Sequence, residues 1–103
     1  MSFQEVFAKV KEKISKYNGN HDFLAVQVTL KDLNQVLYVE IKNGNICAEP
    51  YEYNDRQANI IISSKNFMKL MNKELNPIFA FTVGKLKVEG DVGKAVEIAK
   101  LFE

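Results

Sequence analysis

The sequence predicts an α+β fold in which helices cover one face of a single sheet. Three observations carry this prediction. Apolar residues recur at helical spacing near the N-terminus, they alternate in short runs between residues 23 and 48, and helical and strand patterns then mix up to the C-terminus. A chain of 103 residues is long enough to bury one core. We therefore expect a single domain over residues 1–103.

The first element is a predicted helix over residues 2–17. Ser2 and Glu5 form an S-x-x-E capping box, which is typical of a helix start. The apolar residues that follow fall in one stripe, as in a helix that lies on a core: Phe3, Val6, Phe7, Val10, Ile14 and Tyr17. Two acid-first pairs four residues apart favour the same helix, Glu5–Lys9 and Glu12–Lys16. Asn18-Gly19-Asn20 predicts its end.

Strands are predicted next, at residues 23–30, 35–42 and 45–48. Asn43-Gly44 separates the second from the third, and this dipeptide predicts a tight hairpin because both residues tolerate positive φ. Residues 51–57 are polar and indicate a loop. The apolar run at residues 58–62 predicts a short strand that is buried on both faces.

The second half of the chain mixes helices with one more strand. Ser63 or Ser64 caps a predicted helix that reaches Leu75, and Asn76-Pro77 breaks it. A short helix then runs to Val83, with Gly84 as its left-handed end. A strand follows at residues 85–89, and Asp91 caps the last helix.

Composition excludes several classes of protein. Hydrophobic residues make up 47% of the chain and charged residues 26%, as in an ordinary soluble domain. Net charge is +1, and only Arg56 of the 14 basic residues is an arginine, so we expect no nucleic-acid partner. No apolar run has the length of a membrane-spanning helix. The single cysteine, Cys47, suits a reducing compartment, and we expect a cytoplasmic protein.

Catalytic and metal-binding patterns are not evident in the sequence. His21 is the only histidine, and no cysteine cluster accompanies it, so we expect no metal ion and no cofactor. Cys47 has no basic neighbour that would lower its pKa. Acidic residues gather in one polar loop, where solvated charge explains them: Glu49, Glu52 and Asp55.

The run from Asn76 to Asp91 carries more large apolar surface than one helix face can bury. Three interpretations remain open from these residues: core packing, a dimer interface, and an apolar cavity. Met68 and Met71 suit a cavity wall that repacks around varied ligands, because methionine is flexible and polarizable.

Four segments of the chain resemble the sterol carrier protein 2 (nonspecific lipid-transfer) family. They are N-P-x-x-A-F at 76–81, G-K-L-K-V-E-G-D at 84–91, A-N-I-I-I-S-S-K-N-F-M-K-L-M at 58–71 and Y-V-E-I-K-N-G at 38–44. Together they span nearly the whole chain in the family's order, as in a small stand-alone member. The chain departs from the family at Ile78 and Val83, where many members carry polar residues.

This resemblance implies a five-stranded, mostly antiparallel sheet with helices packed on one face and an apolar tunnel between them. It implies binding and transfer of fatty acids, fatty acyl-CoA, sterols or phospholipids, without catalysis, with the last helix as a lid. The residues that we expect near the cavity are apolar: Phe67, Leu70, Met71, Ile78, Phe79, Phe81, Val83, Val96, Leu101 and Phe102.

Two rival functions stay open beside lipid transfer. The first is a scaffold that presents a lipid or quinone to partner enzymes, or a dimerisation module for them. The second is an enzyme that uses one carboxylate, which we do not expect. We expect a monomer or a weak dimer. Helix 2–17, whose stripe is flanked by Lys9, Lys13 and Lys16, is either a transient contact with an anionic membrane surface or simply a core-facing helix.

Overall fold

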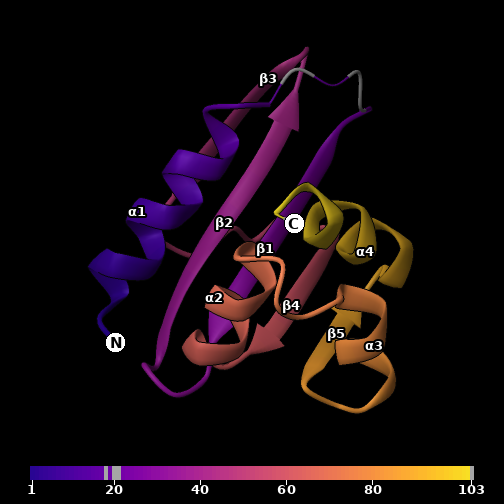
Figure 1. The fold of residues 1–103 in the computed structure, drawn as a ribbon. Helices are drawn as coiled ribbons and strands as arrows, with labels where there is room; N and C mark the ends of the chain where they lie inside the picture. The colour runs from indigo at the N-terminus through magenta and orange to yellow at the C-terminus, as the bar shows by residue number, and fades with distance from the viewer. Residues whose placement is uncertain (18, 20–21, 103) are drawn as a thin grey trace.

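Five strands form one sheet in the computed structural model, which describes residues 1–17, 19 and 22–102. They are β1 (Leu24–Leu30), β2 (Gln35–Lys42), β3 (Asn45–Glu49), β4 (Ala58–Ile62) and β5 (Leu86–Gly90). The strand order is β3-β2-β1-β4-β5 (Figure 1). Every neighbouring pair is antiparallel except β1 and β4, which are parallel. The predicted five-stranded, mostly antiparallel sheet is therefore confirmed.

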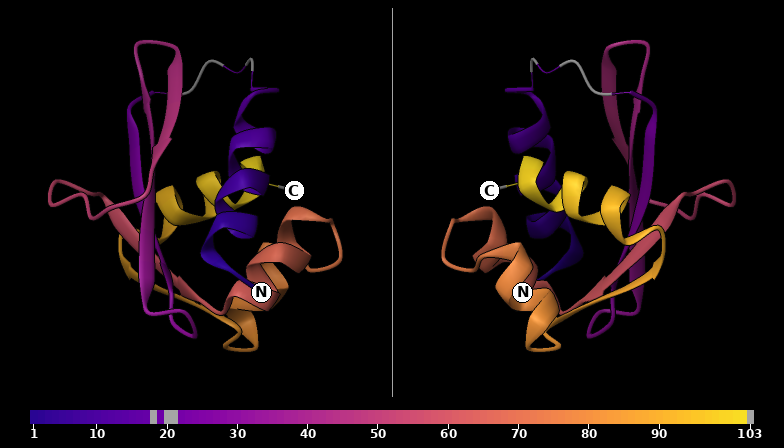
Figure 2. Two further views of the ribbon diagram at one scale, coloured as in Figure 1. Left: turned by 90° about the vertical axis from the view of Figure 1, so that its left-hand side faces the viewer. Right: turned by 90° about the vertical axis from the view of Figure 1, so that its right-hand side faces the viewer.

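The helices all lie on one face of this sheet, as predicted (Figure 2). They are α1 (Phe3–Ile14), α2 (Ser64–Met71), α3 (Pro77–Thr82) and α4 (Val92–Leu101). α1 packs on α2 and β3, α3 packs on β5 and α4, and α4 crosses β1, β4 and β5. The loop between β3 and β4 projects from the opposite face, which we call the outer face (Figure 2).

Local signals place most element ends correctly. Asn43 and Gly44 have φ of 54° and 79°, so the predicted hairpin joins β2 to β3. The Ser63 side chain accepts from Asn66 N–H and caps α2, and the Asp91 side chain accepts from Lys94 N–H and caps α4. Gly84 has a φ of 82° and follows α3, as expected.

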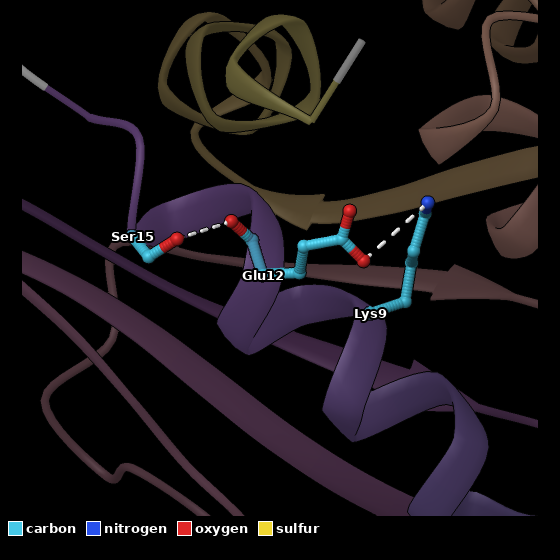
Figure 3. Close-up of polar contacts among 3 residues, drawn as sticks. All are labelled: Lys9, Glu12 and Ser15. Carbon is cyan, nitrogen blue, oxygen red and sulfur yellow. Dashed lines mark hydrogen bonds and ion pairs between the residues drawn. The ribbon is translucent and has the colours of Figure 1, made fainter.

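The capping box of α1 is confirmed, but its predicted ion pairs are wrong. The Glu5 carboxylate accepts a hydrogen bond from Ser2 N–H at 3.2 Å, and this cap occupies the carboxylate that was expected to pair with Lys9. Lys9 Nζ lies instead 3.7 Å from Glu12 Oε2 (Figure 3). The other predicted ion pair, Glu12–Lys16, does not form, because α1 ends at Ile14 and Lys16 lies beyond the helix.

α1 also ends three residues before the predicted position. Its last residue is Ile14, and Ser15 Oγ donates a hydrogen bond to the Glu12 carbonyl at 2.6 Å (Figure 3). A serine that bonds the helix's own carbonyl competes with the regular backbone bonds and favours a helix end. The predicted stop at Asn18-Gly19-Asn20 lies partly outside the described residues.

The helix-facing side chains of β1 are fully buried, as the alternation predicts. They are Leu24, Val26, Val28 and Leu30. The outer side of the same strand is buried as well, which alternation alone does not predict. Ala25 is 0% exposed and Gln27 is 4% exposed. The β3–β4 loop covers them, since Tyr53 N–H donates to Gln27 Oε1 and Gln57 N–H donates to the Ala25 carbonyl.

One side chain ties the turn between β1 and β2 to the start of α2. Asp32 Oδ1 accepts from Ser64 N–H at 2.7 Å, and Asp32 Oδ2 accepts from Ser64 Oγ at 2.5 Å. These two hydrogen bonds, from the hydroxyl first and the amide second, lower the pKa of Asp32. The turn therefore contributes a negative group to the N-terminus of α2, where negative charge is favoured.

We predict that Asp32 makes the stability of the fold depend on acid. A carboxylate with a lowered folded pKa stabilises fully above its ordinary pKa of 3.8, and this contribution is lost as the pH falls through the lowered folded value. Asp32→Asn should therefore lower the melting temperature by a few degrees at neutral pH, with a smaller difference below that window. Thermal melts against pH measure this effect. Asp55→Asn, in an exposed loop, is the control, and equal effects of both substitutions would refute the assignment.

Gly90 allows the β3–β4 loop to approach β5 closely. Its φ is 92°, and a Cβ atom there would lie 2.7 Å from the Gln57 carbonyl oxygen. That carbonyl accepts from Asp91 N–H at 3.0 Å, immediately before α4 begins. Because Gly90 has no side chain, Gln57 of the loop can approach β5 closely enough to bond to Asp91 at the start of α4.

We predict that Gly90→Ala destabilises the fold by about 1–3 kcal/mol through backbone strain, with an additional cost from the contact with Gln57. Gly84→Ala is the matched control, because Gly84 has a similar φ of 82° but no atom within 4 Å of an added Cβ. Denaturant unfolding should show a larger loss at Gly90. Equal losses would mean that the close approach has no energetic role.

Candidate functional site

The residues predicted to line a cavity separate into groups in the structure. Phe67, Leu70 and Met71 of α2 and Phe102, the C-cap of α4, are buried within the core. We call these four the inner group. The rings of Phe67 and Phe102 meet edge to face, with centroids 5.4 Å apart and planes at 81°. The inner group therefore joins α2 to the end of α4 above the sheet.

The predicted residues of α3 lie elsewhere. Ile78, Phe79, Phe81 and Val83 are 52%, 54%, 40% and 49% exposed, and we call them the α3 surface. α3 has six residues and buries only its Pro77 and Ala80. A helix of this length has one side against the sheet, so its other large side chains face solvent. The expectation that all these residues lie around one cavity stays a prediction.

The remaining predicted residues, Val96 and Leu101, are half-buried on α4. Leu101 packs against the core. The inward side of α4 consists of Ala95, Ile98 and Ala99. Two of these three are alanines, which bury little apolar area, so α4 is held less firmly than a helix with large inward side chains.

The inner group contains no polar side chain. In the described part of the chain the buried polar residues are Gln27, Asn59 and Ser64, and each has hydrogen-bond partners. Gln27 and Asn59 face away from the helices, and Ser64 bonds to Asp32. The packed layer between α2, α4 and the sheet is therefore apolar and offers no group that would orient a polar reactant.

Three titratable side chains on the outer face, those of Cys47, Tyr53 and Tyr38, have raised pKa values. Burial raises the pKa of the Cys47 thiol, the opposite of the shift that a nucleophilic cysteine needs. A hydrogen bond to the Glu40 carboxylate raises the pKa of Tyr53, and burial raises the pKa of Tyr38. Tyr38 and Tyr53 stack with centroids 4.7 Å apart, so these rings pack the loop onto the sheet.

Within residues 1–17, 19 and 22–102, no three histidine, cysteine or acidic side chains gather where they could hold a metal ion. His21 lies outside the described residues. No helix in the same ranges combines the length and the apolar character that crossing a membrane requires.

A directional chain of hydrogen bonds crosses the outer face, and sequence reasoning missed it. Gln27 Oε1 accepts from Tyr53 N–H at 3.2 Å, and Gln27 Nε2 donates to Thr29 Oγ1 at 3.4 Å. Thr29 Oγ1 donates to Asn59 Oδ1 at 2.9 Å, and Asn59 Nδ2 donates to Glu89 Oε1 at 3.1 Å. The available signal was the polar residues within apolar strand runs, Gln27 and Thr29 in β1 and Asn59 in β4. The sheet register places Gln27 beside Asn59 and Asn59 beside Glu89.

A polar depression of about 440 Å³ lies at one end of this chain of hydrogen bonds. Its lining comes from the β3–β4 loop and from the paired ends of β4 and β5: Asn54, Arg56, Gln57, Ala58, Asn59, Glu89 and Gly90. This lining is largely polar and charged, and it lies on the sheet face away from the inner group. It is therefore not a site for an acyl chain.

The chain is similar to several curated proteins over part of their length. It is 33% identical to human sterol carrier protein 2 over 63 residues. This alignment covers 61% of this chain and 12% of that protein. It is 29% identical to peroxisomal multifunctional enzyme A of Dictyostelium discoideum over 100 residues. This alignment covers 93% of this chain and 21% of that protein. These alignments thus span only a small part of each relative.

Solved structures share the fold over nearly the whole chain. Sterol carrier protein-2 like-3 from Aedes aegypti superposes with a TM-score of 0.74 at 15% identity, covering 99% of this chain and 97% of that one. Sterol carrier protein-2 from the same organism, in complex with palmitate, gives 0.69 at 15%, covering 99% and 96%. The sequence itself matches the SCP-2 sterol transfer family over residues 3–103. With that match and the shared fold, the chain belongs to the SCP-2 sterol transfer family.

Proposed function

We propose that residues 1–103 form one lipid-binding domain that takes up an apolar lipid chain between α2, α4 and the sheet, and that transfers it without catalysis. The observation that carries the proposal is the wholly apolar junction of Phe67 and Phe102. Membership of the SCP-2 sterol transfer family supports it. These observations favour lipid transfer over a scaffold or dimerisation module.

α4 is the element that we propose to move. Its inward side is made largely of alanine, so its displacement exposes less apolar area than the displacement of a helix rich in leucine. Such a movement separates Phe102 from Phe67 and opens the space above the sheet. A lipid chain that enters then replaces the apolar contact that the two rings lose.

Burial of hydrocarbon supplies the driving force, about 0.8 kcal/mol for each CH₂ group removed from water. Because the inner group has no polar atom to pair with a headgroup, the headgroup stays at the opening. We place that opening beside α3, which contacts α4. Fatty acids, acyl-CoA, sterols and phospholipids all share the apolar portion that this arrangement requires.

We propose a cytoplasmic location for this activity. Cys47 is a free thiol, which is consistent with a reducing compartment.

We predict saturable, one-to-one binding of fatty acids whose dissociation constant falls with chain length. Each added methylene should tighten binding by at most about fourfold, until the chain exceeds the space available. Displacement of a fluorescent fatty acid measures the series, and native mass spectrometry gives the stoichiometry. If no fatty acid, sterol or phospholipid binds saturably, the proposed function is wrong.

We predict that filling the space beneath α4 weakens this binding. Ala99 is buried on the inward side of the helix, so Ala99→Leu should raise the dissociation constant for palmitate at least about tenfold by taking the volume of several methylenes. Overpacking should also cost about 1–3 kcal/mol of stability, which a thermal melt monitors. Ala8→Leu makes the same change on the exposed side of α1 and is the control. A folded Ala99→Leu variant with unchanged affinity would locate the ligand elsewhere.

A further inference from the structure

The α3 surface is an unusual concentration of exposed apolar side chains. Ile78, Phe79, Phe81 and Val83 are each at least 40% exposed and fall within six consecutive positions. A helix rises about 1.5 Å per residue, so these side chains share one small area at a corner of the molecule. Contiguous apolar area of this kind on a folded domain marks a contact with a protein or a membrane.

The polar groups of α3 are satisfied within the element itself. Asn76 Oδ1 accepts from Ile78 N–H at 2.9 Å and from Phe79 N–H at 3.0 Å, and Pro77 has no N–H to satisfy. Thr82 is the one residue with a polar side chain among 77–83, and its Oγ1 donates to the Ile78 carbonyl at 2.9 Å.

Three carbonyls of α3 are paired as well, with N–H groups that follow them in the chain. The Phe79, Ala80 and Phe81 carbonyls accept at 3.0, 2.8 and 3.3 Å from Val83, Lys85 and Gly84. These three carbonyls can leave water without losing a hydrogen bond, and such losses are the main cost when a polypeptide enters a lipid phase.

A cation lies at the base of α3. Between Leu75 and Val88 the charged residues are Lys85 and Lys87, and both are exposed. Lys85 lies directly against α3, since its N–H donates to the Ala80 carbonyl. Lys87 alternates with the buried Leu86 and pairs with Ile61, so it lies on the outer face of the sheet. An apolar projection with a cation at its base matches a bilayer that has anionic phosphates at the surface and acyl chains beneath.

α1, the other candidate for a membrane contact, does not combine these features. Its Val6 and Val10 are 0% exposed, and the rest of its apolar stripe packs against the core. On its solvent side, Lys9 pairs with Glu12 (Figure 3). Its apolar side chains are buried or half-buried, whereas those of the α3 surface are exposed.

We propose that the α3 surface docks the protein on an anionic lipid bilayer, with its apolar side chains among the acyl chains and Lys85 at the lipid phosphates. This inference rests on the proposed lipid transfer and assigns its membrane contact to α3. Because α3 contacts α4, docking brings the proposed opening to the bilayer surface.

The test measures co-sedimentation of the ligand-free protein with vesicles of phosphatidylcholine, with and without phosphatidylserine. Phe79→Ser should reduce partitioning onto phosphatidylserine vesicles at least about tenfold, since it removes one large inserted side chain. Phe23→Ser is the matched control and should have no effect. Phe23 is 41% exposed and precedes β1, whereas α3 leads into β5 at the other end of the sheet, where Leu30, Ile62 and Leu86 are in register. Ile78→Ser should repeat the Phe79→Ser result.

Charge is tested separately. Lys85→Ala should cost about fivefold in partitioning, only when phosphatidylserine is present and less at high salt. Lys42→Ala, at the exposed end of β2, and Lys87→Ala, on the outer face of β5, should cost much less. Fatty-acid affinity should stay within about twofold in the lysine variants, so loss of vesicle binding is separable from loss of the lipid site. Equal losses for Phe79→Ser and Phe23→Ser, or a wild-type dimer that Phe79→Ser dissociates in sedimentation, would overturn the proposal.

Discussion

The edge-to-face contact between Phe67 and Phe102 closes the helical layer over the sheet, and much of the structure serves to bring these two rings together. Asp32 fixes the start of α2 to the turn after β1. At the start of α4, Asp91 caps the helix and Gly90 lets the loop bind directly beside it. Each helix is thus anchored at its N-terminus, and the two meet where Phe102, the C-cap of α4, contacts Phe67 of α2. Such a contact lacks directional bonds, which is consistent with its proposed replacement by a lipid chain.

The large apolar side chains of the second half divide between the interior and the surface. The inner group has the properties of a store for hydrocarbon, because it is buried and contains no polar atom. The α3 surface has the properties of the proposed docking element, because it is exposed, adjoins Lys85 and pairs many of its backbone groups locally. The proposed transfer of lipid needs both, and both come from one segment of about forty residues.

The outer face of the sheet is a separate environment. There the loop between β3 and β4 seals β1 with hydrogen bonds and stacked tyrosines, and polar side chains bond across three strands. This arrangement buries Gln27 and Asn59 without leaving their amides unpaired, which would be costly. It also keeps these polar groups away from the inner group, so the helix-facing side of the sheet remains apolar.

The features that depend on residues a few positions apart could be predicted from the sequence. The capping box at Ser2, the hairpin at Asn43-Gly44 and the left-handed Gly84 were all predicted, because each depends on the φ preference or side-chain reach of neighbouring residues. Strand alternation predicted the helix-facing core, and four motifs in order indicated the family and its sheet.

Which apolar residues are buried depends on how whole elements pack together, and this could not be read from the sequence. Phe67 and Phe79 look equally suited to a core in sequence, but α2 lies beneath neighbouring elements whereas α3 lies at a corner with one side covered. The parallel pairing of β1 with β4 and the partner of Lys9 were likewise set by contacts distant in the chain or by competing bonds. The burial of side chains and the pairing of strands depend on which surfaces meet. The residue pattern along one strand or helix does not specify the element that packs against it.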